Sequence, residues 1–598
     1  MFQSFERHTR PENGAPRIAA LRAEMTRRGL DGVLVPRTDA WQGEYVAPCD
    51  ERLAWLTGFS GSAGIAAILA DRAALFVDGR YRLQAGEEVD AALIDVHKYE
   101  DGALPAWLAA ALTGGGRVAF DPWLHGFGEI DRLLGKLRPA GITLTETANL
   151  VDAVWTDRPA RPAAPVFVHP TERAGREHDA KRADLAAELA GAGQRAAVLT
   201  APESIAWLLN IRGGDIAHTP VAQGFAILHD DARVDLFMAP SKLDEAARAH
   251  LGAEVTIRPE AEFEAALAAL TGPVRVDRQR APFRVTRCLG DAGVERAFGA
   301  DPCLAPRATK TDAEIAGAKE AHLIDAAAMA EFLSGLEATA PGGLTEIDVV
   351  TRLEACRRET GQLREIAFDT IAGSGPHGAI VHYRVTRESN RALRDGDLLL
   401  IDSGGQYEAG TTDITRTVPV GKVDPALAEI FTRVLRGLIA MSSARWPAGL
   451  AGRDLDALAR APLWAAGEDY DHGTGHGVGS YLSVHEGPQR LSRKAEAVLE
   501  PGMILSIEPG CYRPGEFGIR IENLAVIEAS DPGADARAMR RFRTLTRVPI
   551  DRRLILIDRL TGAERAWIDG YHDAVRAALT PRLGPEAAAW LERATRPL

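Results

Sequence analysis

The 598-residue sequence predicts a multidomain fold with two related α/β domains followed by one α+β domain. The first half alternates helical periodicity with short β-branched runs, twice and in the same order. The second half opens with two capped helices and continues as short strands, which is typical of helices packed on a largely antiparallel sheet. Hydrophobic residues make up 46% and charged residues 26%, as in an ordinary globular protein.

The first predicted domain spans 1–158 and starts with a helix over 17–25, where apolar residues recur at helical spacing. Further elements are expected at 32–35, 51–56, 66–69 and 74–78. The second predicted domain, 159–305, repeats that order from a helix at 183–189. Its further elements are expected at 197–199, 203–208, 226–228 and 234–237.

Trp55 and Trp207 occupy corresponding positions of the two copies, 152 residues apart, and core packing is the favoured interpretation of both. A period this long predicts duplicated domains rather than a solenoid. The Pro-rich stretch 158–165 is predicted to join them. In the first copy, Arg80 or Tyr81 is a candidate to line the mouth of a site and restrict substrate length.

The third predicted domain, 306–545, opens with two helices that carry their own start signals. Thr311 with Glu314, and Thr345 with Asp348, have the spacing of N-terminal capping pairs. Strands are then expected at 365–372, 379–385, 397–403, 410–418, 502–511 and 517–527, with two helices between about 423 and 470. The tail, 546–598, predicts an amphipathic appendage that packs on this domain or on a partner subunit.

The charge pattern and the cysteines exclude several classes of protein. The formal net charge is −13, and no basic stripe accumulates, so no nucleic-acid partner is expected. No N-terminal apolar signal region and no run of eighteen apolar residues occurs, so no membrane association is expected. Five cysteines without CxxC spacing argue against a disulfide framework and favour a reducing, cytoplasmic compartment.

Five ionisable residues in the last third of the chain stand in apolar, Thr-rich or glycine-rich segments. They are Asp402, Asp413, His476, Glu508 and Glu522. A carboxylate at the end of an apolar, β-rich run is costly to bury unless its charge is compensated. Four converging carboxylates would also repel one another, and divalent cations remove that repulsion. The set therefore predicts a two-metal hydrolase site.

The spacing of these residues supports convergence. Asp402 and Asp413 are eleven residues apart around glycines, so two antiparallel strands can bring both to one sheet edge. Glu508 and Glu522 are fourteen apart and allow a second hairpin, while His476 enters from a glycine-rich loop. Carboxylates plus one imidazole suit Mn²⁺, with Co²⁺ or Zn²⁺ possible, and argue against a structural zinc. Two ions about 3.5–4 Å apart would share bridging carboxylates and a water.

Each residue alone also has a plain structural interpretation. Asp402 in Asp-Ser-Gly-Gly is a common turn residue, His476 in its loop can be structural, and Glu508 can open a turn before Pro-Gly. The glycines of 473–479 are unlike a phosphate cradle, because the Walker lysine and the GxGxxG spacing are missing. The coincidence of all five residues favours the metal site.

Seven segments resemble the motifs of the Xaa-Pro aminopeptidases (aminopeptidase P), in their long, three-domain cytosolic form. They are Ile-Val-His-Tyr 380–383, Leu-Ile-Asp-Ser-Gly 400–404, Thr-Asp-Ile-Thr-Arg-Thr 412–417, His-Gly-Thr-Gly-His-Gly-Val-Gly 472–479, Val-His-Glu-Gly-Pro 484–488, Ser-Ile-Glu-Pro-Gly 506–510 and Ile-Arg-Ile-Glu-Asn 519–523. The resemblance covers nearly the whole chain. It implies two creatinase-type α/β domains, a pita-bread α+β catalytic domain and a short C-terminal extension.

The resemblance implies a dinuclear centre with two Mn²⁺ per subunit. Asp402 would bind one ion, His476 and Glu508 the other, and Asp413 and Glu522 would bridge them. Glu508 would also accept a proton from the attacking water.

It further implies residues on the substrate side of the centre. His382, His472 and His485 correspond to the family's substrate-side histidines: His485 would hydrogen-bond the scissile carbonyl, and His382 would face the proline subsite. Arg520 would orient bridging Asp413.

The implied reaction is release of the N-terminal residue from peptides with proline second, by a homodimer. Proline lacks an N–H and its φ is fixed near −65°, which obstructs proteases that grip that donor. Prolidase, which takes dipeptides only, is the nearest alternative, and the duplicated N-terminal half favours the aminopeptidase. A non-catalytic pita-bread binding protein or a metal-free, creatinase-like hydrolase is disfavoured by the complete ligand set.

Overall fold

The computed structural model describes residues 1–7, 9–339 and 341–598, and it divides the chain into two compact units. Unit 1 contains Met1–Arg7 and Ala305–Leu598, and unit 2 contains the residues between them. The predicted class, two related α/β domains and an α+β domain, is confirmed, with the two α/β domains together forming unit 2. The predicted domain boundaries stay a prediction.

Unit 2 contains two six-stranded sheets with identical topology. The first has the order β4-β3-β2-β1-β5-β6, with β1 (Gly32–Pro36), β2 (Ile65–Leu69), β3 (Ala73–Val77), β4 (Asp95–Lys98), β5 (Gly116–Phe120) and β6 (Ile142–Glu146). The second has the order β12-β11-β10-β8-β13-β14, with β8 (Ala196–Leu199), β10 (Phe225–His229), β11 (Val234–Phe237), β12 (Val255–Arg258), β13 (Val274–Val276) and β14 (Arg296–Phe298). Corresponding strands also pair in the same directions, so the duplication read from the sequence is confirmed.

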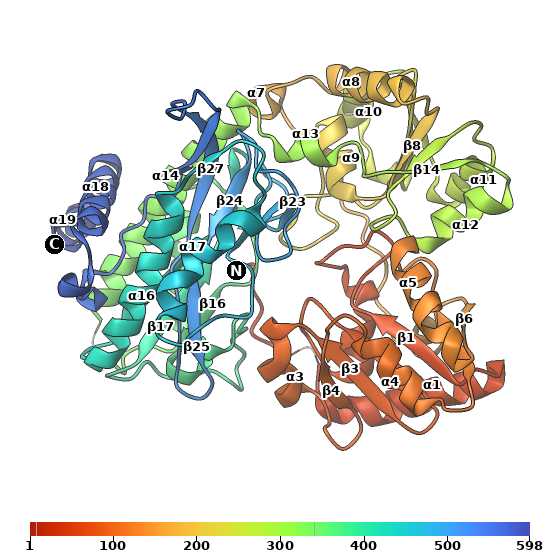
Figure 1. The fold of residues 1–598 in the computed structure, drawn as a ribbon, viewed down its shortest axis with the longest axis horizontal. Coiled ribbons are helices and arrows are strands. Elements are labelled where there is room, and N and C mark those ends of the chain that lie inside the picture. The colour runs from red at the N-terminus through yellow and green to blue at the C-terminus, as the bar shows by residue number, and fades with distance from the viewer. Residues whose placement is uncertain (8, 340) are drawn as a thin grey trace. The chain divides into compact units, whose positions relative to one another are not determined.

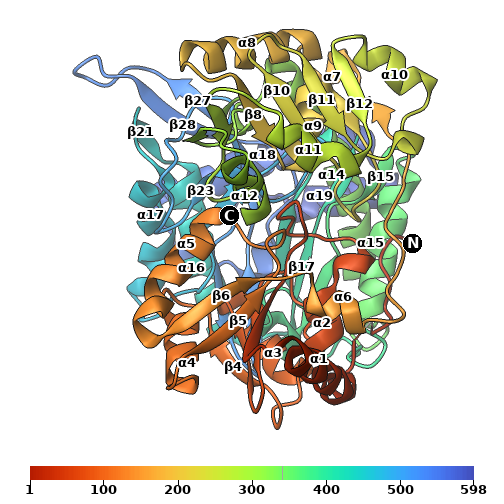
Figure 2. The ribbon, with the colours of Figure 1, turned by 90° about the vertical axis from the view of Figure 1, so that its right-hand side faces the viewer.

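Helices cover these sheets as the apolar periodicity predicted (Figures 1 and 2). The first copy carries α1 (Gly14–Arg28), α2 (Arg52–Thr57), α3 (Arg82–Glu88), α4 (Ala103–Ala111), α5 (Phe127–Leu137) and α6 (Leu150–Val154). The second carries α7 (Thr171–Ala174), α8 (His178–Gly191), α9 (Pro202–Leu209), α10 (Glu245–Leu251), α11 (Phe263–Ala268) and α12 (Phe283–Asp291). In addition, β7 (Phe167–Val168) and β9 (Ile211–Arg212) pair as a two-stranded antiparallel sheet. Figure 2 shows β12, β11, β10 and β8 side by side.

The two repeat tryptophans pack within unit 2, which confirms their structural interpretation. Trp55 lies on α2 and stacks on Trp155, with ring centroids 5.2 Å apart. Trp207 lies on α9 and is buried, with the Lys181 ammonium 4.5 Å from its ring centroid. Nearby in the first copy, Arg80 pairs with Asp78 at 2.7 Å and Tyr81 is buried, so both belong to the local structure of unit 2.

Unit 1 places helices against short strands. Its helices are α13 (Leu304–Ala308), α14 (Asp312–Glu337), α15 (Glu346–Glu359), α16 (Pro425–Ser442), α17 (Gly452–Trp464), α18 (Gly562–Leu579) and α19 (Pro585–Ala594). Both predicted capping boxes form, at Thr311 and at Thr345. Helices α18 and α19, from the C-terminal tail, pack on α14 (Figure 1).

The strands of unit 1 form four sheets. Two three-stranded sheets are β15 (Leu363–Ile366), β18 (Gly405–Tyr407) and β19 (Gly410–Thr411), and β16 (Ile371–Ser374), β17 (Leu398–Ser403) and β20 (Ile414–Pro419). A six-stranded sheet has the order β21-β28-β27-β24-β22-β23, with β21 (Arg445–Pro447), β22 (Gly475–Gly477), β23 (Glu486–Leu491), β24 (Ile504–Ile507), β27 (Asn523–Ser530) and β28 (Met539–Thr544). A two-stranded ribbon pairs β25 (Gly510–Arg513) with β26 (Phe517–Arg520).

The strand predicted over 379–385 is wrong. Gly375–Ala379 forms a 3-10 helix and residues 380–382 form a turn. The reason is a close backbone approach: a Cβ on Gly378 would lie 2.9 Å from the main-chain nitrogen of Gly518. The apolar residues of this segment therefore pack as a loop against β26 instead of adding a ladder of their own.

Four other predicted strands are each two strands. The segment 365–372 divides into β15 and β16, and 410–418 divides into β19 and β20. The segment 502–511 divides into β24 and β25, and 517–527 divides into β26 and β27. Three of these breaks fall at candidate ligands, Asp413, Glu508 and Glu522. None of the five cysteines, all within the described residues, forms a disulfide. Among the described residues, no helix has the length and apolar character needed to cross a membrane.

Candidate metal centre

Asp402 and Asp413 belong to neighbouring antiparallel strands, as their spacing predicted. Asp402 lies near the end of β17, where it pairs with Thr415 of β20. Asp413 directly precedes β20, whose first residue, Ile414, pairs with Ser403. The two carboxylates are therefore delivered to the same end of one pair of strands, and both side chains are buried.

Glu508 and Glu522 face one another across a change of strand partner. β24 pairs with β27 as far as Ile507 opposite Asn523, and β25 pairs with β26 from Gly510 opposite Arg520. Both glutamates lie in the interval between these ladders. The main-chain nitrogen of Glu522 donates to the carbonyl of Thr415 at 3.1 Å, which joins this interval to β20.

His476 reaches the same place from β22, the short strand between β23 and β24. Gly475 allows the close approach, because a Cβ there would lie 1.9 Å from the carbonyl oxygen of Ser506. The main-chain nitrogen of His476 donates to Ser506 Oγ at 2.9 Å. The glycine-rich segment therefore serves to seat the imidazole against β24.

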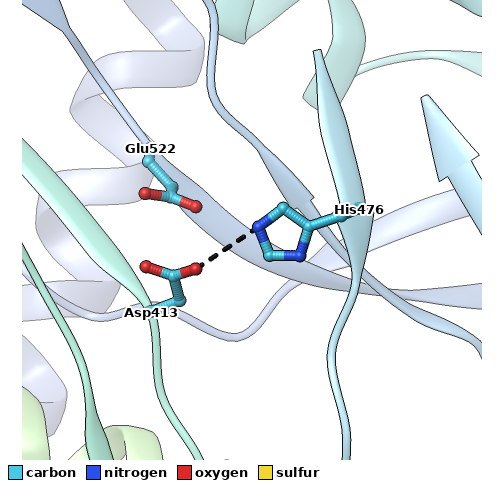
Figure 3. A group of neighbouring side chains, drawn as sticks. All are labelled: Asp413, His476 and Glu522. Atoms are coloured by element: carbon cyan, nitrogen blue, oxygen red, sulfur yellow. Dashed lines mark ion pairs between the residues drawn. The ribbon is translucent and has the colours of Figure 1, made fainter. Parts of the chain in front are cut away.

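The side chains converge on one point. Potential ligand atoms of Asp413, His476 and Glu522 all lie within 4.8 Å of one another. Figure 3 shows the two carboxylates facing each other, with a ring nitrogen of His476 directed at them. His476 Nε2 is 3.4 Å from Asp413 Oδ2 and 3.4 Å from Glu508 Oε1.

The tautomer of His476 is set by its other nitrogen. Nδ1 lies 2.9 Å from the carbonyl oxygen of Gly477, which can only accept, so Nδ1 carries the hydrogen and donates it. In the neutral ring Nε2 then holds a lone pair directed at the carboxylates. This arrangement, with one nitrogen fixed by a carbonyl and the other free to ligate, is typical of metal-binding histidines.

Three carboxylate oxygens of the cluster fit a bound cation. Asp402 Oδ1, Asp413 Oδ1 and Glu522 Oε1 are buried and have no hydrogen-bond partner among the described residues. Burial, followed by repulsion from Asp402 and Glu508, raises the pKa of Asp413 well above its usual range. Burial, followed by repulsion from Asp413 and Glu508, does the same to the pKa of Glu522. Acceptors without donors that repel one another are the environment that a divalent cation satisfies.

Glu508 differs from Asp413 and Glu522 in the direction in which its surroundings shift its pKa. Burial acts to raise its pKa, but the neighbouring His476, His472 and Arg520 outweigh burial and lower it. Its Oε1 accepts a hydrogen bond from Ser506 Oγ at 3.1 Å. The surrounding protein therefore favours the ionised form of Glu508, in contrast to Asp413 and Glu522.

Arg520 contacts Asp402, whereas we expected it to orient Asp413. Its Nη2 donates to Asp402 Oδ2 at 2.6 Å, and its Nε donates to Thr415 Oγ1 at 3.2 Å. The reason is the strand pairing: Asp402 and Thr415 are cross-strand partners, so a side chain that reaches Thr415 also reaches Asp402. The same guanidinium donates from Nη2 to the carbonyl of Val381 at 3.2 Å.

Tyr512 is a site residue that the sequence did not reveal. Its hydroxyl accepts from Arg520 Nη1 at 2.7 Å and lies 2.9 Å from His472 Nε2. It links the arginine that holds Asp402 to one of the substrate-side histidines. The signal was the hairpin register: Tyr512 pairs with Gly518, so Tyr512 and Arg520 share a face.

Thr415 was also missed. Its Oγ1 donates to Glu522 Oε2 at 2.7 Å, which leaves the opposite oxygen, Oε1, without a partner among the described residues. A threonine beside an aspartate in a Thr-rich strand gives no local sign of this role. Only the pairing of β20 against the β26–β27 interval reveals it.

The three histidines that we expect on the substrate side are His382, His472 and His485, and two of them lie beside candidate ligands. His485 packs edge to face on His476, with ring centroids 4.4 Å apart. His472 lies with Nδ1 4.0 Å from Glu508 Oε2, and burial lowers the pKa of His472 to about 4. His382 is half-buried in the turn after the 3-10 helix, directly following Val381, whose carbonyl Arg520 binds.

Family models match the chain in four consecutive regions. Metallopeptidase family M24 matches residues 316–529, and the C-terminal region of peptidase M24 matches 538–598. The Creatinase/Prolidase N-terminal domain matches twice, at 17–154 and 157–314. The two N-terminal matches correspond to the two sheets of unit 2.

Two relatives that match nearly the whole chain are both named as aminopeptidases P. A "Probable Xaa-Pro aminopeptidase P" of Talaromyces stipitatus is 36% identical over 98% of this chain and 92% of its own length. "Aminopeptidase P2" of Arabidopsis thaliana is 37% identical over 95% of this chain and 86% of its own length.

Two solved structures give the comparison in three dimensions. An X-prolyl aminopeptidase from Caenorhabditis elegans, described as a cytosolic enzyme with a di-nuclear active site, has a TM-score of 0.94 and 32% identity. It is matched over 98% of this chain and 100% of that chain. A prolidase from Pyrococcus horikoshii has a TM-score of 0.51 and 26% identity, and covers only 62% of this chain.

Proposed function

The chain belongs to the Xaa-Pro aminopeptidase P group of metallopeptidase family M24, and we propose that it hydrolyses the bond between an N-terminal residue and a following proline in peptides. The observation that carries the proposal is the convergence of Asp413, His476 and Glu522 with Glu508 and Asp402 on one point. Family and full-length coverage favour the aminopeptidase over the prolidase, whose match reaches 62% of the chain.

A two-ion metal centre follows from the family and from the donor set. We propose that the centre holds two Mn²⁺ ions: Asp402 would bind one, His476 and Glu508 would bind the other, and Asp413 and Glu522 would bind both. Four oxygen donors and one imidazole suit Mn²⁺, and Co²⁺ or Zn²⁺ would also fit. When bound, such a pair supplies Lewis acidity and lowers the pKa of a bound water towards about 7.

The residues of the chain handle the proton and the substrate. Glu508, whose ionised form is favoured, accepts the proton of the attacking water and can return it to the leaving proline nitrogen. His485, packed on His476, donates to the scissile carbonyl as negative charge develops on its oxygen. His382 contacts the proline ring, and His472 is held near Glu508 by the Tyr512 hydroxyl.

Proline suits this arrangement for a chemical reason. The proline nitrogen carries no hydrogen and its φ is fixed near −65°, so a protease that binds that N–H loses a contact. Nothing in the proposed mechanism uses that hydrogen, because the carbonyl and the free amino terminus are the groups that the site holds.

The test is hydrolysis of peptides in the presence and absence of metal. We expect release of the first residue from Xaa-Pro-Yaa tripeptides, no release from Xaa-Ala-Yaa, loss of activity with a chelator and its return with Mn²⁺. Activity restricted to Xaa-Pro dipeptides would establish the prolidase instead. Peptide binding without hydrolysis at any metal concentration would establish a binding protein.

We also propose that the enzyme is a homodimer located in the cytoplasm. The Caenorhabditis elegans neighbour is described as cytosolic, and none of the five cysteines of this chain, all within the described residues, forms a disulfide. Sedimentation of the purified protein at micromolar concentration tests the dimer, and a mass equal to one chain would contradict it.

A further inference from the structure

We propose that the C-terminal segment 546–598 is part of the scaffold of the metal centre, and that Arg416 is the positioning residue that connects the two. The proposal rests on the proposed function, because it concerns how the metal ligand Glu522 is held. Arg416 lies on β20, three residues after Asp413, and only 2% of it is exposed.

The environment of Arg416 is unusual for a buried cation. Among the residues that the structure describes, its guanidinium forms no ion pair, and all of its hydrogen bonds end on neutral oxygens. A buried charge without a paired charge is costly, so its retention calls for a reason beyond packing. Burial lowers the pKa of Arg416, and Glu522, a proposed metal ligand, is the carboxylate that acts against this effect.

On one side the guanidinium holds the main chain of the metal centre. Nη1 donates to the carbonyl of Thr415 at 2.8 Å and to the carbonyl of Glu522 at 2.6 Å. Thr415 in turn donates from Oγ1 to Glu522 Oε2 at 2.7 Å. One nitrogen therefore fixes the backbone of the proposed bridging ligand and the backbone of the residue that orients its carboxylate.

On the other side the same guanidinium holds the C-terminal segment. Nε donates to the carbonyl of Pro549 at 3.0 Å, and Nη2 donates to the carbonyl of Val548 at 2.7 Å and to Tyr571 Oη at 3.0 Å. The Tyr571 hydroxyl, on α18, donates to the Val548 carbonyl at 2.7 Å. Helix α18 and residues 548–549 therefore supply acceptors to the Arg416 guanidinium, which also binds the main-chain carbonyl of Glu522.

Arginine is required for this geometry. Its planar fork presents donors in fixed directions, whereas a lysine ammonium is a compact point charge on a flexible stem. A lysine at 416 keeps the charge but cannot reach acceptors on β20, on the Glu522 main chain and on the C-terminal segment together. Charge and positioning can therefore be separated by one substitution.

A second link between the same regions provides a matched control. Arg436 of α16 donates from Nε to Glu564 of α18 at 2.8 Å. This pair also ties the C-terminal segment to the rest of unit 1, but it is partly exposed and contacts no candidate ligand. If Arg416 were only a structural link, its loss and the loss of the Arg436–Glu564 pair should have the same effect on Mn²⁺ binding.

The experiment compares full-length Arg416→Lys, Tyr571→Phe and Arg436→Lys with the unaltered protein. Mn²⁺ affinity is measured by competition with a chromophoric chelator, alongside thermal unfolding without metal and kcat at saturating Mn²⁺. We expect Arg416→Lys to weaken Mn²⁺ binding about tenfold to a hundredfold, and Tyr571→Phe to weaken it less, as for groups that orient metal ligands. Arg436→Lys should keep its Mn²⁺ affinity within about twofold, whatever its unfolding temperature.

The outcomes separate this inference from the proposed function. If the unaltered protein binds Mn²⁺ and both Arg416→Lys and Tyr571→Phe bind it equally well, the positioning role is wrong and the metal centre stands. Equal weakening in Arg436→Lys also overturns the role of Arg416. If Arg416→Lys does not fold, Tyr571→Phe decides the question alone. An unaltered protein that binds no Mn²⁺ overturns the metal centre together with this inference.

Discussion

At the scale of single residues, three proposed ligands each have one polar atom held by a hydrogen bond within the protein, which leaves the other polar atom to bind a cation. His476 presents Nε2 because Gly477 holds Nδ1, and Glu522 presents Oε1 because Thr415 holds Oε2. Asp402 presents Oδ1 because Arg520 holds Oδ2. Each ligand is thereby fixed before a cation arrives, so binding costs little reordering of side chains.

His485 offers a direct test of the substrate side. Replacing it with alanine should lower kcat by about a hundredfold to a thousandfold, the usual cost of removing one donor to a developing oxyanion. Mn²⁺ content should be unchanged, because the contact of His485 with His476 is that of ring edge on ring face. Kinetics with an Xaa-Pro-Yaa peptide and metal analysis measure both quantities.

The control is another histidine of the same chain. His229 of β10 hydrogen-bonds Asp235 within unit 2, and His229→Gln should leave kcat within twofold of the unaltered enzyme, a range of about 0.4 kcal/mol. A His485→Ala variant that loses Mn²⁺ along with activity would contradict the assigned role and place His485 among the groups that support the metal.

The sequence identified the five proposed ligands because each is an ionisable residue in a segment where burial would be costly. Tyr512 and Thr415 escaped notice because tyrosine and threonine are ordinary strand residues. Their roles come from strand pairing: Tyr512, opposite Gly518, shares a face with Arg520, and Thr415 reaches Glu522 across the β26–β27 interval. The hydrogen bond of Arg520 to Asp402 was not predicted, for the same reason.

At the scale of elements, the ligands sit where strands stop or change partners. β24 and β27 separate from β25 and β26 at Glu508 and Glu522. A continuous strand would alternate its side chains between two faces and commit every backbone group to a ladder. The interruption frees Glu508 and Glu522 from this alternation, and Glu508 reaches His476 while Glu522 reaches Asp413 and His476. Sequence patterns alone did not place these breaks, because the apolar runs continue on both sides.

Gly473 and Gly475 belong to one motif, and an alanine at each position distinguishes a need for backbone freedom from a need for close packing. At Gly475, an added Cβ would meet the Ser506 carbonyl at 1.9 Å, whereas at Gly473 the nearest atom is 3.4 Å away. Gly475→Ala should therefore push β22 from β24, displace His476 and weaken Mn²⁺ binding by more than about tenfold. Gly473→Ala should be tolerated.

Thermal unfolding and chelator competition on the two variants measure this difference. Equal effects of the two alanines would show that the motif needs backbone freedom rather than the close approach of Gly475 to Ser506.

Helix α18 gives the protein a defined sensitivity to acid. His572 is fully buried, and its Nε2 accepts a hydrogen bond from the main-chain nitrogen of Ile550 at 3.2 Å, which requires an unprotonated nitrogen. Burial, followed by the charges of Arg552 and Arg416, lowers the pKa of His572 to about 4. In the unfolded chain the pKa of histidine is about 6.5. Below that pH the unfolded state binds a proton that folded His572 does not bind until the pH approaches 4.

The stability contributed by neutral His572 is therefore complete above about pH 6.5 and is lost as the pH falls towards 4, by roughly 3 kcal/mol at most. His572→Asn, which keeps an acceptor but does not titrate, should flatten this part of the pH dependence. Denaturant unfolding of both proteins at pH 7, 6 and 5 measures the difference. Parallel curves for the two proteins would contradict the assignment.

At the scale of the whole molecule, the two compact units should differ in their response to metal. Every candidate ligand lies in unit 1, and the two repeated sheets lie in unit 2. A ligand that binds one folded unit stabilises that unit by about 2.7 kcal/mol at a hundredfold excess over Kd. Calorimetry should therefore resolve two transitions, of which Mn²⁺ raises only the one assigned to unit 1.

Hydrogen exchange along the unfolding curve assigns each transition to its residues. Equal displacement of both transitions by Mn²⁺ would mean that the molecule unfolds as one cooperative block.

The duplication in unit 2 was readable from sequence because it depends on the order of elements, which survives divergence of the residues. The membership of Met1–Arg7 in unit 1 was not readable, because nothing in those residues indicates a partner more than three hundred positions away.

That attachment has a consequence for biosynthesis. The main-chain nitrogen of Phe2 donates to Glu354, and Gln3 exchanges hydrogen bonds with Thr370, at separations of 352 and 367 residues. At about 5–20 residues per second, the ribosome delivers these partners roughly 20–70 seconds after the segment that needs them. Throughout that interval the leading residues have no place to dock, while the intervening chain can already fold. The docking of residues 1–7 is therefore a late event in synthesis, and a stall during translation would leave this segment without its partners.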